Sequence, residues 1–75
     1  MMRRFIYRVQ ELLADRGEVL NDLQRGAGVH RKTLYRGPKR KQTIAAIAYY
    51  LGMSAEELVA GTDVEEIWYN DTSEY

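Results

Sequence analysis

The sequence contains no cysteine, one histidine and one proline among its 75 residues. Without cysteine the chain forms no disulfide and no thiolate metal site, and one histidine cannot supply a histidine cluster. A catalytic Ser-His-Asp or Cys-His set therefore has no support. We expect a protein that is not an enzyme and that needs no cofactor. The absence of cysteine also fits a reducing compartment.

Long apolar runs are missing as well. No stretch approaches the roughly 20 apolar residues of a membrane-spanning helix. The basic start, M-M-R-R-F-I-Y-R-V, lacks the uninterrupted apolar segment of a signal peptide. We therefore expect a cytoplasmic protein without membrane contact. A chain of this length forms one small domain, which buries roughly 60% of its unfolded surface and offers no evident small-molecule site.

A net charge of zero conceals a strong asymmetry along the chain. All eleven Lys and Arg residues but only four of the eleven acidic residues lie in positions 1–50, which gives that part +7. The other seven acidic residues lie in positions 51–75, which gives −7. This division predicts nucleic-acid contact by the basic part and an acidic tail.

Residues 19–36 have the pattern of two short helices joined by a tight turn. In the first helix, predicted over residues 20–25, Leu20 and Leu23 lie on one face. The run Gly26-Ala27-Gly28 follows. A glycine just past a helix end takes a positive φ without strain, so the chain can reverse there.

The second helix of this pair is short and has two different sides. It begins near His30 and ends by Arg36, because Pro38 lacks an N–H and disfavours helical geometry at Gly37. Leu34 can face inward while the basic side chains face outward. A short helix that is apolar on one side and basic on the other fits the DNA major groove.

Apolar spacing near 3.6 residues predicts the remaining helices. They cover residues 2–16 and 43–51, and a further short helix is opened by Ser54 as N-cap with Glu57 at the third helical position and ended by Gly61. The fold class is therefore all-α, a compact bundle of about five short helices. The side chains that we expect to share one core are Phe5, Val9, Leu12, Leu23, Val29, Leu34, Ile44, Ile47, Leu51 and Leu58.

These segments occur in an order that is similar to a known family. L-Q-R-G-A-G-V-H-R-K-T-L-Y is followed by I-A-A-I-A-Y-Y-L-G-M-S-A-E-E-L-V-A-G-T. Over about residues 5–62 the chain resembles the helix-turn-helix domain of the lambda repressor and Cro superfamily. The matching residues are Leu23, Gly28, Val29, Thr33, Leu34, Ile47, Ala48, Leu51, Gly52, Ser54 and Leu58.

The resemblance implies a lambda repressor-like domain over residues 1–62, with an acidic aromatic tail over residues 63–75. It also implies a sequence-specific DNA-binding transcriptional regulator, of the phage or mobile-element repressor type. Because a single small domain rarely binds one site specifically, we expect a homodimer on two half-sites of double-stranded DNA. We expect no dimerisation domain after residue 75, so dimer contacts would come from the fold or the tail.

The candidate DNA contacts belong to the recognition helix and to the loop after it. We expect the basic residues and the tyrosine of the helix to face the groove, and the threonine to reach a base or a phosphate. Three basic residues in the loop would hold phosphates; a solvated charge run is the alternative. The set is Arg31, Lys32, Thr33, Tyr35, Arg36, Lys39, Arg40 and Lys41.

Two groups of residues outside this set have open roles. His30 is either an exposed turn residue or one more DNA contact, and a lone histidine is not expected to bind metal. The arginines of the first helix, Arg3, Arg4 and Arg8, fit a solvated outer face better than a phosphate contact.

The alternative function is a protein-interaction module, antitoxin-like or a mobile-element accessory factor, that keeps the fold with weak or no DNA reading. Three features favour it: the recognition helix is shorter than usual, Leu20 stands where the family usually has a phosphate-binding Gln, and the tail is acidic and aromatic. In addition, Gln24 stands where the family prefers a small Ala that lets the two helices approach closely.

The tail carries an apolar trio among acidic residues. Thr62 and Glu65 can cap a short sixth helix with Val64, Ile67 and Trp68 on it, and Ile67-Trp68-Tyr69 equally fits a short strand. Since an exposed tryptophan is costly, this segment docks either on its own domain or on a second copy. We expect its acidic charge to moderate DNA binding, and residues 70–75 to fray.

Overall fold

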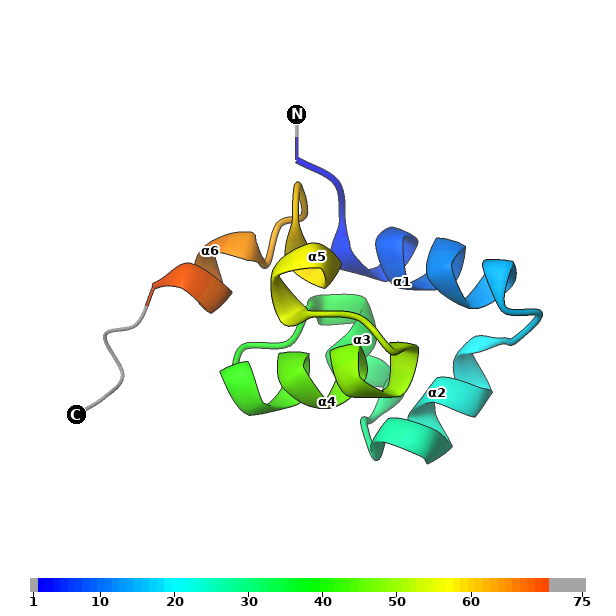
Figure 1. Ribbon diagram of the computed structural model, residues 1–75. Coiled ribbons are helices and arrows are strands. Elements are labelled where there is room, and N and C mark those ends of the chain that lie inside the picture. The colour runs from blue at the N-terminus through cyan, green and yellow to red at the C-terminus, as the bar shows by residue number, and fades with distance from the viewer. Residues whose placement is uncertain (1, 71–75) are drawn as a thin grey trace.

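Six helices follow one another in residues 2–70, the part of the chain that the computed structural model describes (Figure 1). The predicted all-α fold is confirmed. The alternative strand at residues 67–69 is wrong, because that segment is helical; the expected fraying lies largely outside the described residues. The helices are α1 (Phe5–Asp15), α2 (Leu20–Ala27), α3 (Arg31–Arg36), α4 (Lys41–Leu51), α5 (Ala55–Val59) and α6 (Glu65–Tyr69).

The start of α1 is tied to the end of the family-like region. The Arg3 N–H donates to the Gly61 carbonyl at 2.9 Å, and the Asp63 N–H donates to the Arg3 carbonyl at 2.8 Å. The Asp63 carboxylate also accepts from the Phe5 N–H at 3.0 Å, and so caps a helix that has no side-chain cap of its own. These contacts explain why α1 begins at Phe5 rather than at residue 2.

The apolar faces of the helices meet in one core. Leu34 is fully buried, as the helix-turn-helix assignment requires. Leu12 is only partly buried and packs on the edge of the core, whereas the other nine predicted core residues are buried within it. Ile67 and Trp68 of α6 also pack against this core, so the described part of the tail docks on its own domain.

The predicted turn residues act at the helix ends. Gly28 ends α2 with φ 69°, and Gly52 ends α4 with φ 71°. The Ser54 hydroxyl caps α5 by accepting from the Glu57 N–H at 3.1 Å. α4 begins at Lys41, earlier than the predicted residue 43, since no residue after Pro38 prevents helical geometry there.

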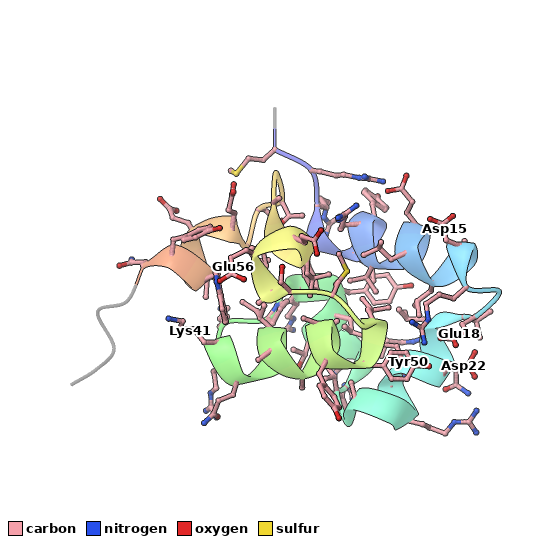
Figure 2. The ribbon with its side chains drawn as sticks, in the orientation of Figure 1. Asp15, Glu18, Asp22, Lys41, Tyr50 and Glu56 are labelled. Carbon is pink, nitrogen blue, oxygen red and sulfur yellow. The ribbon has the colours of Figure 1, made fainter. Side chains whose placement is uncertain are left out.

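Helices α2 and α4 approach closely at Gly26, which lies inside α2. The ring of Tyr50 packs on this glycine, and a Cβ atom at the position would overlap the ring. The Tyr50 hydroxyl donates to Glu18 Oε1 at 2.8 Å, and the Arg16 guanidinium lies 5.3 Å from the ring centroid (Figure 2). The hydrogen bond to Glu18 raises the pKa of Tyr50. The ring is therefore held by contacts with Glu18 and Arg16.

Candidate nucleic-acid interface

Helix α3 is short but well anchored. The Nδ1 atom of His30 accepts from the Lys32 N–H at 3.1 Å, so His30 caps the helix. From the sequence, His30 was expected to be either an exposed turn residue or a DNA contact. In the structure it is exposed, and its side chain caps α3. The helix ends at Gly37, with φ 92°, directly before Pro38. Its only buried side chain is Leu34.

The exposed side chains of α3 form a central pair and two flanks. At about 100° per residue, Lys32 and Arg36 point away from the buried Leu34. Arg31 and Tyr35 lie on one flank, where the Arg31 guanidinium is 6.0 Å from the Tyr35 ring centroid. Thr33 lies on the other flank and is half-buried.

Beside the Thr33 flank lies an open hollow of about 440 Å³, which we call the basic hollow. Four cationic side chains and two threonine hydroxyls line it, and none of its described lining residues is acidic. Such side chains are the usual partners of DNA phosphates. The lining residues are Lys32, Thr33, Arg36, Gly37, Lys39, Arg40 and Thr43. Five of the eight predicted contacts therefore meet in one place.

Lys41 does not line the basic hollow. It is the first residue of α4 and not part of a loop as the sequence predicted. Its Nζ atom lies 5.0 Å from the centroid of the Trp68 ring. It lines a second hollow, of about 350 Å³, together with Lys39, Arg40, Gln42 and Asn70. Lys41 is thus turned toward α6 rather than toward α3.

Arg4, which precedes α1, and Arg8, which lies within it, donate hydrogen bonds to the backbone of other helices. Arg8 donates to the Glu57 carbonyl at 3.0 Å and to the Leu58 carbonyl at 3.4 Å. Arg4 donates to the carbonyl of Tyr35 in α3 at 3.2 Å. Arg4 is exposed, as expected, and Arg8 is half-buried, but both also hold the backbone of another helix. The carbonyl groups near the ends of short helices need hydrogen-bond donors, and the side-chain pattern of a sequence does not predict which residue supplies them.

Arg3 fits the predicted outer face. Its guanidinium pairs with Glu11 at 2.8 Å, and both side chains are exposed. The hydrogen bond from Arg3, with its positive charge, lowers the pKa of Glu11. Glu11 lies within α1, and Arg3 lies two residues before that helix.

The start of α2 is acidic. Leu20 is buried and offers no donor. Asp22 caps the helix by accepting from the Val19 N–H at 3.0 Å. Figure 2 shows Asp15, Glu18 and Asp22 gathered at this end of the molecule. A helix start covered by carboxylates repels phosphate, so phosphate contacts have to come from elsewhere.

Gln24 contacts the recognition helix. Its Oε1 atom accepts from Arg31 Nε at 3.3 Å, so the glutamine orients an arginine on the exposed flank of α3. The sequence indicated only that Gln24 departs from the small residue usual at this position. The structure adds a contact between the two helices of the pair.

Two helices joined by a tight turn, with the second presenting a basic outer face beside a basic loop, define a helix-turn-helix DNA-binding domain. A model of the Cro/C1-type HTH DNA-binding domain matches residues 8–63, and the chain belongs to this family. It is a DNA-binding regulator of that general type. A comparison with curated proteins finds no match. Among residues 2–70, no helix is long and apolar enough to cross a membrane.

Proposed function

We propose that the protein is a sequence-specific repressor of the phage or mobile-element type, which binds double-stranded DNA through α3 and the basic hollow. The observation that carries the proposal is the convergence of Lys32, Arg36, Lys39 and Arg40 around one open hollow beside α3. Four cations so close together attract a polyanion, and the attraction weakens as salt screens it.

Within this proposal the eight residues divide into reading and anchoring groups. Lys32 and Arg36 read base edges from the centre of α3, and Arg31, Thr33 and Tyr35 support them from its flanks. A good bidentate contact with guanine contributes about 1–3 kcal/mol of discrimination. Lys39, Arg40 and Lys41 hold phosphates and set the register of α3 in the groove.

In the proposed role the protein acts in the cytoplasm as a homodimer and catalyses no reaction. A recognition helix of six residues reaches few base pairs, so two copies on adjacent half-sites are needed for specificity. Sedimentation with and without a palindromic duplex tests this part. Two chains per duplex would support it, and one chain per duplex at saturation would contradict it.

A salt titration tests DNA binding itself. Affinity for a mixed duplex is measured by fluorescence anisotropy from low to high salt. A protein that neutralises Z phosphates loses affinity with a slope of about −0.9Z in log–log form. For Lys39, Arg40 and Lys41 we expect a slope near −3 per chain, and selection from a random DNA pool then yields the site. A flat salt response would contradict the proposal.

The rival proposal is a protein-interaction module that keeps the fold. The acidic start of α2, with Asp22 capping the helix and Leu20 buried, favours it, since a second backbone contact is then missing. The same titration separates the two. Absence of binding to any duplex at low salt would support the interaction module.

A further inference from the structure

The segment that follows the family match packs against both ends of the loop that carries Lys39 and Arg40. We call residues 37–40 the basic loop and residues 64–70 the C-terminal clamp. We propose that the C-terminal clamp positions the basic loop for phosphate contact, with Trp68 as its positioning residue. The DNA part of this inference rests on the proposed function.

Val64 grips the start of the basic loop. Its side chain is 3% exposed, and its Cγ1 atom would lie 3.1 Å from a Cβ on Gly37. A side chain at position 37 would crowd Val64, and the positive φ of 92° at Gly37 also favours glycine. Pro38 is fully buried next to it. The first half of the basic loop is therefore fixed by packing.

Trp68 grips the other end. The ring lies 5.0 Å from Lys41 Nζ, a separation at which a cation is attracted to the ring face. Its Nε1–H donates to Glu56 Oε2 at 3.1 Å, which fixes the ring between α5 and α4. Figure 2 shows Lys41 and Glu56 on the same side of the molecule, next to α6.

The contact has a second effect on α4. Lys41 occupies the first position of the helix, where the positive end of the helix dipole disfavours a cation. The electron-rich ring of Trp68 offsets that repulsion, and so favours a helix that begins directly after Arg40. Without the ring, the first turn of α4 would open more easily.

Between the two fixed ends, Lys39 and Arg40 are exposed. A loop held in this way loses little conformational entropy when its side chains contact phosphate. The smaller entropy cost makes binding stronger. Helix α6 itself has no fully buried residue. Its tryptophan therefore meets the charged groups at the start of α4 and on α5 rather than filling the centre of the core.

The first test needs no DNA. Trypsin cleaves after Lys39, Arg40 and Lys41 only when this region opens, and mass spectrometry assigns the cuts. We expect Trp68→Ala to speed cleavage there by roughly tenfold, as for a segment whose local stability falls. Tyr69→Ala is the matched control, because it removes an exposed aromatic residue from the same helix. Equal cleavage of the two variants would overturn the inference.

A second pair of variants covers the case in which Trp68→Ala unfolds the whole domain. Glu56 is exposed, so Glu56→Ala removes the acceptor of the Trp68 N–H without touching the core. Glu56→Gln keeps an acceptor and removes the charge. We expect faster cleavage for Glu56→Ala than for Glu56→Gln. Equal rates would contradict a role for the hydrogen bond in holding the clamp.

The second test uses DNA and a double-mutant cycle. Trp68→Ala leaves the net charge unchanged, and we expect it to weaken duplex binding by roughly tenfold when Arg40 is present. In an Arg40→Ala background the same change should matter much less. Equal losses in both backgrounds would overturn the positioning role. If the wild type binds no duplex, the proposed function fails, while the cleavage rates still decide whether the clamp holds the loop.

Discussion

Leu34 is the side chain on which the position of α3 depends. It is fully buried and is the only buried residue of that helix. Leu34→Ala should lower the free energy of unfolding by about 2–5 kcal/mol, because it removes buried methyl groups and leaves a cavity. Urea denaturation followed by circular dichroism measures this. Tyr49→Ala, at a residue that is 89% exposed, is the control and should change stability by less than about 0.5 kcal/mol. An equal effect of both would contradict the role given to Leu34.

Reading and anchoring can be separated by single substitutions. Arg40→Ala should weaken binding to all duplexes alike and reduce the salt slope by about one, because Arg40 is proposed to hold a phosphate. Arg36→Ala, at the centre of the outer face of α3, should weaken binding most on the preferred site and relax its sequence preference. Arg31→Ala should act in the same direction. Anisotropy on preferred and scrambled duplexes measures both effects. Identical losses on every duplex for all three variants would refute base reading by α3.

At the scale of the helix, the packing of α2 on α4 predicts that a glycine-to-alanine change, normally stabilising inside a helix, destabilises the domain at Gly26. An alanine is normally better than a glycine inside a helix, by about 1 kcal/mol. At Gly26, however, the new methyl group would meet the ring of Tyr50, which Glu18 and Arg16 hold in place. Gly26→Ala should therefore destabilise the domain, by about 1–3 kcal/mol as for overpacking.

The matching control for Gly26→Ala is the same change in a Tyr50→Ala background. With the ring removed, the alanine should stabilise the helix as its propensity predicts. Thermal unfolding of the four proteins in this cycle gives the comparison. Destabilisation of similar size in both backgrounds would show that the ring of Tyr50 is not the obstacle.

The elements differ in how far the sequence predicted them. The spacing of apolar residues predicted α1, α4 and the helix pair, because a helix that packs on a core needs an apolar residue about every 3.6 positions. Pro38 and Gly37 also predicted correctly where α3 ends. The start of α1 could not be predicted in this way, because its cap is Asp63, which lies 58 residues further along the chain.

The candidate site was predictable in composition but not in arrangement. The basic residues of α3 and the following segment could be identified from charge, and four of them line one hollow together with Thr33. Lys41 was assigned to a loop, because its stacking on Trp68 depends on where α6 docks. The contacts of Arg4 and Arg8 were missed for a related reason. Both arginines donate to backbone carbonyls of other helices, and a pattern of side chains does not show where such carbonyls lie.

At the scale of the whole molecule, the fold brings the acidic tail next to basic residues that lie far from it in the sequence. Helix α6 begins with Glu65 and Glu66 and lies at the start of α4, close to the basic loop. Removal of residues 63–75 would test the acidic tail poorly. It would also remove the Asp63 cap of α1 and the buried Val64. Neutralising one exposed carboxylate separates the effect of charge from these structural losses.

Glu66 is the residue for that experiment, because it is exposed and lies in the first turn of α6. If acidic charge moderates DNA binding, Glu66→Gln and Glu66→Ala should tighten binding at low salt by similar factors, while Glu66→Asp keeps the charge and should change little. The gain should fade as salt rises, because the screening length falls from about 10 Å at 0.1 M to about 3 Å at 1 M. Sedimentation should give the same mass for all variants. Affinity that follows the size of the side chain rather than its charge, or that does not change at low salt, would remove the moderating role from the tail and leave α6 with the positioning role alone.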